Sequence, residues 1–206
     1  MQFEAILVDL DGVIRHWQSS DESIETAFSL PAGSIRKAAF SPEIVDLAIT
    51  GAIADEEWRE RIVEKLRCQS GAEHAREAVA LWTEQPGAID QNVLSLLKGC
   101  KSSIKLVLVT NATSRLPRDL QALGLLGFFH AVVNSSQVGA KKPSEKIFRA
   151  ALVQASTVPE RALFIDDTPS NIGAATSLGI LSHAFVSHIE LSSFLRQAGV
   201  LRAEAL

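Results

Sequence analysis

The sequence predicts an α/β fold in which a doubly wound parallel sheet carries an inserted bundle of short helices. From about residue 86 onward, short apolar runs alternate with segments of helical periodicity, and this alternation is typical of a parallel sheet with right-handed crossovers. Residues 5–8 form a short run that is apolar on both faces, as expected of a buried strand. Residues 19–85 show helical periodicity without a convincing strand, so they do not form a simple crossover between the first two strands.

Two acids and a glycine follow the first predicted strand directly. Asp9 and Asp11 therefore lie at its carboxyl end, where open α/β sheets bind ligands. Gly12 allows the backbone to turn sharply or to approach a ligand closely. Taken alone, such a pair more often marks a strand that ends in a solvated acidic turn. Three later segments shift the interpretation towards a functional site.

The inserted region contains recognisable helix starts. Ser41-Pro42-Glu43 supplies a capping hydroxyl, a proline in the first turn and an acid near the positive end of the helix dipole. This helix is expected to run to about Thr50, where Gly51 ends it. A further helix begins at Asp55. Apolar residues at helical spacing then form two stripes, Trp58, Ile62 and Leu66, and Ala75, Val79 and Trp82.

The second half of the chain supplies the rest of the predicted core. We divide the chain into a core of residues 1–17 and 86–206 and an inserted helical cap of residues 18–85, which is expected to cover the strand ends. Beyond the cap, strands are predicted at residues 104–109, 128–133, 162–165 and 180–186. Helices are predicted at residues 89–97, 116–123, 143–154, 169–178 and 189–198.

Three further polar segments are expected at the same edge of the sheet as Asp9 and Asp11. Each follows a predicted strand or precedes a predicted helix: Thr110 and Asn111, Lys141 and Lys142, and Asp166 and Asp167. Hydroxyl, amide and turn N–H groups suit phosphate oxygens. An ammonium group near a helix amino terminus strengthens the preference for an anion.

The carboxylates at this edge of the sheet require a cation to balance their charge. Two unit charges about 4 Å apart repel each other by about 4 kcal/mol at an effective dielectric constant near 20. Several such pairs in one cleft are untenable without a positive ion, and oxygen ligands select a hard ion. The sequence therefore predicts a Mg²⁺ site beside a bound phosphate group.

Together these segments resemble the motifs of the haloacid dehalogenase superfamily, which includes aspartate-nucleophile phosphohydrolases. Residues 9–13 resemble the first motif, 109–111 the second, 142–143 the third and 165–167 the fourth, with a helical insertion between the first two. The resemblance covers the core almost end to end and implies a Rossmann-like sheet. Residues 11–17, Thr50-Gly51 and Glu57-Trp58 further resemble the subgroup that includes the phosphatase domain of bifunctional epoxide hydrolases and small sugar-phosphate phosphatases.

The resemblance implies roles for the four acids. Asp9 would be the nucleophile and form an aspartyl-phosphate, and Asp11 would act first as general acid and then as general base. Asp9, the backbone carbonyl of Asp11 and Asp167 would bind Mg²⁺, with Asp166 in support. Which of the two adjacent acids lies closer to the metal stays open at this point.

The remaining matched residues are expected to bind the phosphoryl group. Thr110 and the backbone of Asn111 would hold its oxygens. Lys142 would offset the charge on Asp9 and on those oxygens, which is where electrostatic catalysis of phosphoryl transfer resides. Lys141 is a rival for this role, but the family pattern favours Lys142 and leaves Lys141 in solvent.

Three residues after the nucleophile loop are candidates for substrate contacts: Arg15, His16 and Trp17. Trp17 fits a packing role at the hinge of the cap equally well. A surface position is the safer interpretation for Arg15, because most arginines are exposed.

The predicted function is Mg²⁺-dependent hydrolysis of a phosphomonoester of a small metabolite, with a sugar phosphate as one candidate. One alternative is a phosphomutase of the same family, which would return the phosphoryl group to its substrate. Another is a non-enzymatic, receiver-like domain that is phosphorylated on aspartate. The Asp-x-Asp spacing and the long helical insertion disfavour a receiver, whose crossovers are short.

Composition narrows the partners and the compartment. The formal net charge of −4 argues against nucleic acid as the main partner, since phosphate backbones are bound by a concentrated basic face. No apolar run approaches the roughly 20 residues that span a bilayer. Cys68 and Cys100 are too few for a disulfide framework, so we expect a cytoplasmic protein in which both cysteines pack as small side chains. The sequence leaves the oligomeric state open.

Overall fold

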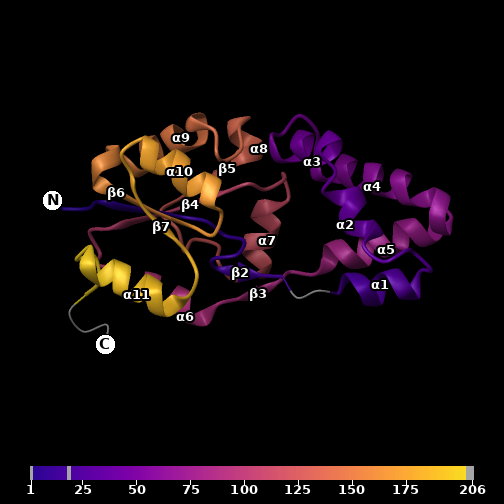
Figure 1. Ribbon diagram of the computed structural model, residues 1–206, viewed down its shortest axis with the longest axis horizontal. Coiled ribbons are helices and arrows are strands. Elements are labelled where there is room, and N and C mark those ends of the chain that lie inside the picture. Colours follow the sequence, from indigo (N-terminus) through magenta and orange to yellow (C-terminus); the bar gives the residue numbers. More distant parts are fainter. Residues whose placement is uncertain (1, 18–19, 203–206) are drawn as a thin grey trace.

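The protein is built around a five-stranded parallel sheet. The computed structural model describes residues 2–17 and 20–202. The strands lie side by side in the order β5-β4-β1-β6-β7, with the first strand of the chain in the centre (Figure 1). Their bounds are Ala5–Val8 for β1, Lys105–Thr110 for β4, Ala131–Asn134 for β5, Ala162–Asp166 for β6 and Leu181–Ala184 for β7. This is the doubly wound parallel sheet that the sequence predicts.

The register of β1 determines which residues meet at the edge of the sheet. Val8 at the end of β1 pairs with Leu108 of β4 and with Ile165 of β6. All four residues of β1 are buried, because helices cover both faces of the sheet. The segments that follow β1, β4 and β6 therefore emerge next to one another.

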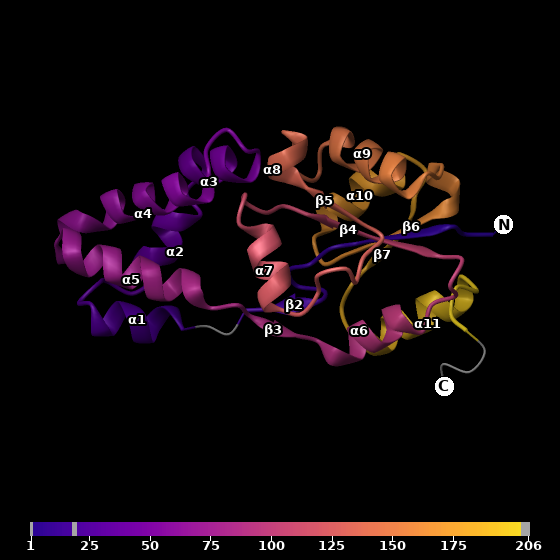
Figure 2. The same cartoon turned by 180° about the vertical axis from the view of Figure 1, so that it is seen from behind.

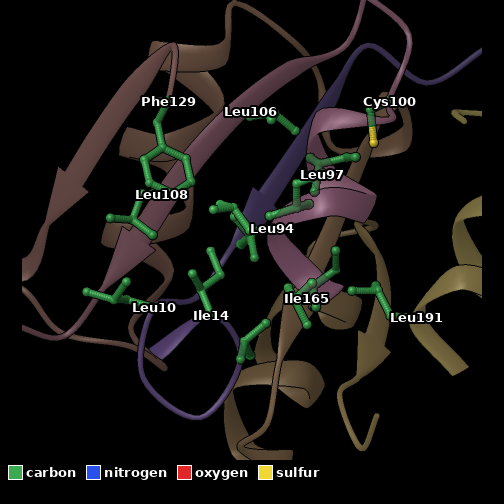
Figure 3. Packing of buried hydrophobic residues seen from close by; sticks show 14 of the residues in the cluster. Leu10, Ile14, Leu94, Leu97, Cys100, Leu106, Leu108, Phe129, Ile165 and Leu191 are labelled. Carbon is green, nitrogen blue, oxygen red and sulfur yellow. The ribbon is translucent and has the colours of Figure 1, made fainter. Parts of the chain in front are cut away.

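Helices from the second half of the chain cover the two faces. One face packs against α6, α7 and α11, and the other against α9 and α10 (Figure 1). Figure 3 shows the first of these cores, where Leu94 and Leu97 of α6 pack with Leu10 and Ile165. The bounds are Gln91–Lys98 for α6, Leu116–Ala122 for α7, Ser135–Val138 for α8, Glu145–Ala155 for α9, Pro169–Ser177 for α10 and His188–Gln197 for α11, with a 3₁₀ turn at Pro159–Arg161.

A separate layer of helices lies at one end of the sheet. This layer, shown in Figure 2, has its own hydrophobic cluster, which includes the buried Ile62 and Leu66. Burying one isoleucine or leucine side chain contributes roughly 1.5–3 kcal/mol to folding, so this cluster stabilises the helical layer. Its helices are α1 at Asp21–Ala27, α2 at Ser34–Ala39, α3 at Pro42–Ile49, α4 at Asp55–Ser70 and α5 at Ala72–Glu84. Among the described residues, none of the helices has the length and apolar composition needed to cross a bilayer.

The structure adds a small ribbon where the chain passes between the two layers. Strand β2, Arg15–His16, pairs antiparallel with β3, Ala88–Ile89. Strands of two residues are too short to show an alternating pattern, so the sequence does not reveal them.

Several boundaries differ from the predicted ones by two or three residues, among them the following two. The strand expected at residues 128–133 begins only at Ala131, because Phe128 and Phe129 pack edge-to-face in the preceding turn with ring centroids 4.9 Å apart. The helix expected from residue 143 begins at Glu145, where the hydroxyl of Ser144 caps it by accepting the N–H of Lys146.

Candidate active site

Asp9 lies immediately beyond the central strand and is almost completely buried. Its backbone N–H donates to the carbonyl of Ile165 at 2.9 Å, which continues the β1–β6 ladder by one residue. Its carboxylate Oδ1 accepts the N–H of Leu10 at 2.7 Å and contacts Nζ of Lys142 at 2.7 Å. Burial raises the pKa of Asp9 to about 7; the Lys142 ammonium opposes this shift, and the Asp166 carboxylate adds to it.

Lys142 places its ammonium between two carboxylates from different strands. Its Nζ lies 2.7 Å from Oδ1 of Asp9 and 2.7 Å from Oδ2 of Asp166. The Lys142 side chain is 1% exposed, so the charge depends on these partners for compensation. The structure thus brings together the residues that the sequence assigned to the first, third and fourth motifs.

Asp166 has hydrogen-bond partners on both oxygens. Oδ1 accepts the N–H of Thr168 at 2.8 Å and Nδ2 of Asn171 at 3.0 Å. Oδ2 accepts Nζ of Lys142 at 2.7 Å and Nδ2 of Asn171 at 3.1 Å. Each oxygen therefore has two donors, which leaves little capacity for a further ligand.

Asp167 is exposed and makes fewer hydrogen bonds than Asp166. Its Oδ1 accepts the hydroxyl of Thr168 at 3.1 Å. The other oxygen lies directly against Gly12, where an added Cβ would come within 2.0 Å of Oδ2. Gly12 also has a φ of +83°, which favours glycine. The glycine of the first motif therefore gives the Asp167 carboxylate room to lie beside the nucleophile loop.

The chemistry of the acidic residues suits a bound cation. One carboxylate oxygen from each of Asp9, Asp166 and Asp167 lies within 4.8 Å of the others. When all three acids are ionised, they exceed the charge of the Lys142 ammonium beside them. An all-oxygen donor set of this kind fits a hard divalent ion such as Mg²⁺.

Thr110 and Asn111 complete the edge of the sheet. Thr110 ends β4 and is 1% exposed, and its hydroxyl has no hydrogen-bond partner among the described residues. A buried hydroxyl without a partner is costly, which points to a ligand that supplies one. Asn111 uses its side chain elsewhere: Oδ1 accepts the N–H of Lys142 at 2.7 Å, and Nδ2 donates to the Lys142 carbonyl at 3.0 Å.

Asp11 is held by side chains from its own loop. Arg15 donates from Nε to Oδ1 at 2.6 Å and from Nη2 to Oδ2 at 2.9 Å, and Trp17 donates from Nε1 to Oδ1 at 2.8 Å. Arg15 is 3% exposed and also contacts Oδ2 of Asp119 on α7 at 3.4 Å. The expectation of a surface arginine was therefore wrong, because three carboxylate oxygens compensate its buried charge.

Two other predicted residues have their ion-pair partners outside this centre. His16 is half exposed, with Nε2 3.7 Å from Oδ2 of Asp90. Lys141 was expected in solvent, but its ammonium pairs with Asp46 of α3. Lys141 thus links the sheet to the helical layer, while Lys142 serves the buried site.

Asp55 joins the helical layer to the loop after β4. Its Oδ1 accepts the hydroxyl of Thr113 at 2.7 Å, and its N–H donates to Oγ of Ser114 at 3.0 Å. Gly51 provides a second contact, since an added Cβ would lie 2.0 Å from the carbonyl of Ser136. Sequence patterns did not reveal these contacts, because their partners are far apart along the chain.

A cleft of about 200 Å³ runs between the two layers and reaches the site at Asp11 and Asn111. Its walls include Trp17 of the nucleophile loop, Phe40 and Trp82 of the helical layer, and Arg115 beside α7. The cleft therefore gives the site an entrance lined by both layers.

Comparison with protein families agrees with this architecture. A family model described as haloacid dehalogenase-like hydrolase matches residues 3–179. The phosphorylated carbohydrates phosphatase of Thermotoga maritima is 28% identical over 86% of this chain and 82% of its own length. Haloacid dehalogenase-like hydrolase domain-containing protein 3 of Mus musculus and pyrimidine 5'-nucleotidase YjjG of Escherichia coli match more locally, at 42% and 35% identity. These alignments span only 29% and 48% of the two proteins.

Solved structures share the fold. The enzyme bt-2542 of Bacteroides thetaiotaomicron superimposes with a TM-score of 0.76 over 95% of this chain and all of its own, at 20% identity. A second structure of that enzyme, in complex with magnesium and inorganic phosphate, has a TM-score of 0.72 over 92% of this chain and 98% of its own.

Proposed function

Since the chain belongs to the haloacid dehalogenase-like hydrolases, we propose that it hydrolyses a phosphomonoester of a small metabolite at Asp9, with Mg²⁺ as cofactor. The observation that carries this proposal is the position of the Lys142 ammonium, 2.7 Å from both Asp9 and Asp166. A buried lysine between two carboxylates is suited to a reaction in which negative charge enters and leaves the site. The phosphatases among the relatives support the same reaction class.

In the first step, an oxygen of the Asp9 carboxylate attacks phosphorus in line with the ester bond. The bond from phosphorus to the leaving oxygen breaks, Asp11 donates a proton to that oxygen, and an aspartyl-phosphate results. In the second step, Asp11 takes a proton from water as the water attacks phosphorus. Inorganic phosphate leaves, and Asp9 is regenerated.

We assign the binding of the phosphoryl group to Thr110, Asn111 and Lys142. We assign the Thr110 hydroxyl to a phosphoryl oxygen, because it is buried without a partner among the described residues. The backbone of Asn111 serves the same group, while the Asn111 side chain positions Lys142 through its backbone. Lys142 offsets negative charge as the phosphoryl group is transferred.

Mg²⁺, when bound, would offset the negative charge of the carboxylates and of the phosphoryl oxygens. Asp9, the carbonyl of Asp11 and Asp167 would hold it. We assign the direct role to Asp167 because both oxygens of Asp166 are already engaged by Lys142, Thr168 and Asn171. We further propose that residues 18–85 act as a cap over this site, and the narrower epoxide-hydrolase-like resemblance stays a prediction.

The test measures phosphate release from p-nitrophenyl phosphate with Mg²⁺ and with excess chelator. We expect turnover only with Mg²⁺, and a loss of several orders of magnitude in Asp9→Asn. Glu160→Gln is the matched control, an acid-to-amide change at an exposed residue beside the opposite end of β6. Undiminished turnover in Asp9→Asn or in chelator would overturn the proposal.

A further inference from the structure

The entrance to the site has an unusually aromatic wall. Trp17, Phe40, Trp58 and Trp82 all line the cleft that reaches Asp11 and Asn111. Trp17 is 47% exposed and Phe40 is 51% exposed, although both side chains are large and apolar. Exposed aromatic groups gathered in one cleft mark a binding surface more often than a chance arrangement.

The indole rings present carbon surfaces to the cleft, because their N–H groups are already used. Nε1 of Trp17 donates to Asp11 at 2.8 Å, and Nε1 of Trp82 donates to Oδ1 of Asp21 at 2.8 Å. Nε1 of Trp58 donates to the carbonyl of Ala39 at 3.1 Å. A ligand in the cleft therefore meets the ring faces rather than free indole donors.

Charged side chains of the cleft are paired as well. The pairs are Arg15 with Asp11 and Asp119, Arg36 with Asp21, and Arg115 with Asp119. A ligand rich in hydroxyl groups would gain few hydrogen bonds from charges that are already paired, whereas a flat apolar group needs none. The cleft is thus better suited to a flat apolar group than to a polyol.

Two of the rings already have a guanidinium group over one face. Cζ of Arg15 lies 4.2 Å from the ring centroid of Trp17, and Cζ of Arg36 lies 5.5 Å from that of Phe40. Arg15 covers one face of Trp17, so a ligand ring would lie against the other. The guanidinium groups over these rings show that the ring faces are open to a partner group.

We infer that the substrate is a phosphomonoester whose leaving group carries a flat aromatic ring, which binds against Trp17 and Phe40. This inference rests on the proposed phosphatase function and narrows it. Nucleoside 5'-monophosphates are suitable probes of this class, since they join such a ring to a phosphate through a sugar.

The test compares cytidine, uridine and adenosine 5'-monophosphates with ribose 5-phosphate. All four share the same primary leaving oxygen, so the ring is the main difference between them. We expect kcat/KM to be at least about tenfold higher for a nucleotide, because stacking of a base on an aromatic side chain strengthens binding by about this factor. A kcat/KM for ribose 5-phosphate equal to or above that of every nucleotide would overturn the inference.

A substitution in the wall provides the second measurement. Phe40→Leu keeps an apolar side chain but removes the ring, and Phe40 makes no hydrogen bond to the residues of the reaction centre. We expect the ratio of nucleotide to ribose 5-phosphate kcat/KM to fall at least about threefold in this variant. If the ratio is unchanged, another part of the protein causes the preference for a ring, and the role of Phe40 is overturned.

Binding to the inactive Asp9→Asn variant separates this inference from the function on which it rests. Quenching of tryptophan fluorescence by cytidine 5'-monophosphate, with weaker quenching by ribose 5-phosphate, is expected in Asp9→Asn. If the wild type hydrolyses p-nitrophenyl phosphate but neither binds nor prefers nucleotides, the ring preference alone fails. If it hydrolyses no phosphomonoester at all, the proposed function fails with it.

Discussion

The guanidinium of Arg15 binds the Asp11 carboxylate through both oxygens, with distances of 2.6 Å from Nε to Oδ1 and 2.9 Å from Nη2 to Oδ2. Trp17 adds a third hydrogen bond, to Oδ1. Oδ1 therefore has two donors, whereas Oδ2 has one and keeps a free lone pair. In the proposed mechanism, the proton that Asp11 transfers would reside on Oδ2. Arg15 would thus fix both the orientation of the acid and the oxygen that it uses.

Replacing Arg15 should impair catalysis more than binding. In Arg15→Met we expect kcat to fall by about tenfold to a hundredfold, because misplacing a catalytic group by about 1 Å has effects of this size. The change in KM should be smaller, because Arg15 holds the acid rather than the substrate. Steady-state kinetics measure both. Arg118→Met, at an exposed arginine of α7, is the control, and equal kcat values in both variants would contradict the role of Arg15.

Asn111 is expected to act through Lys142. Its side chain exchanges two hydrogen bonds with the Lys142 backbone, so Asn111→Ala leaves a partly buried N–H and carbonyl without partners. We expect the free energy of unfolding to fall by about 1–3 kcal/mol, together with a loss of kcat. Urea unfolding and steady-state kinetics provide the readouts. Asn92→Ala on the exposed face of α6 should be nearly neutral, and equal stability of the two variants would show that these bonds contribute little.

The two acids after β6 should respond differently to Mg²⁺. Asp167 is exposed, so Asp167→Asn should change stability in the absence of metal by less than about 0.5 kcal/mol. It should raise the Mg²⁺ concentration at half-maximal activity by at least about tenfold. Replacing a residue that supports a metal ligand only indirectly already weakens metal affinity by about that factor. Asp166→Asn removes a partner of the buried Lys142 and should destabilise the protein by about 3 kcal/mol or more.

Thermal unfolding with and without Mg²⁺ measures these effects without relying on turnover. At a concentration of Mg²⁺ about a hundredfold above its dissociation constant, the wild type should gain about 2.7 kcal/mol. Asp167→Asn should lose most of this gain, and Glu160→Gln should keep it. A full gain in Asp167→Asn would place the metal elsewhere.

The sequence alone is sufficient to predict the sheet and the convergence of the motifs at one edge of it. Carboxyl ends of parallel strands meet at one edge, so Asp9, Thr110 and Asp166 come together once the strands are identified, whatever the details of the helices. Asn171 on the helix after the fourth motif joins the same group, since its amide donates to both oxygens of Asp166.

Contacts between distant side chains could not be predicted in the same way. Arg15 meets Asp119, which lies on a helix more than a hundred residues later, and nothing in the local pattern distinguishes this arginine from a surface one. The stripe that contains Trp82 predicts a buried helix face, but whether an aromatic ring also borders a cleft depends on how the helices pack. Local periodicity carries no information about that packing.

The two cysteines should differ sharply in reactivity. Cys100 is buried beside α6, and burial raises the pKa of its thiol to about 11. A raised thiol pKa keeps the unreactive protonated form dominant, so at pH 8 only about one molecule in a thousand carries the Cys100 thiolate. Cys68 on α4 is exposed, contrary to the expectation that both cysteines pack inside. Its thiol should therefore react as an accessible one does.

Titration with 5,5'-dithiobis(2-nitrobenzoic acid) at pH 8 tests this difference. The native protein should release about one equivalent of thionitrobenzoate quickly, and the second equivalent should appear only in denaturant, when Cys100 regains an ordinary pKa and contact with water. Cys68→Ser should remove the fast equivalent and keep the slow one. Rapid release of two equivalents from the native protein would mean that the α6 side of the core opens readily, because a thiol buried there must first reach solvent to react.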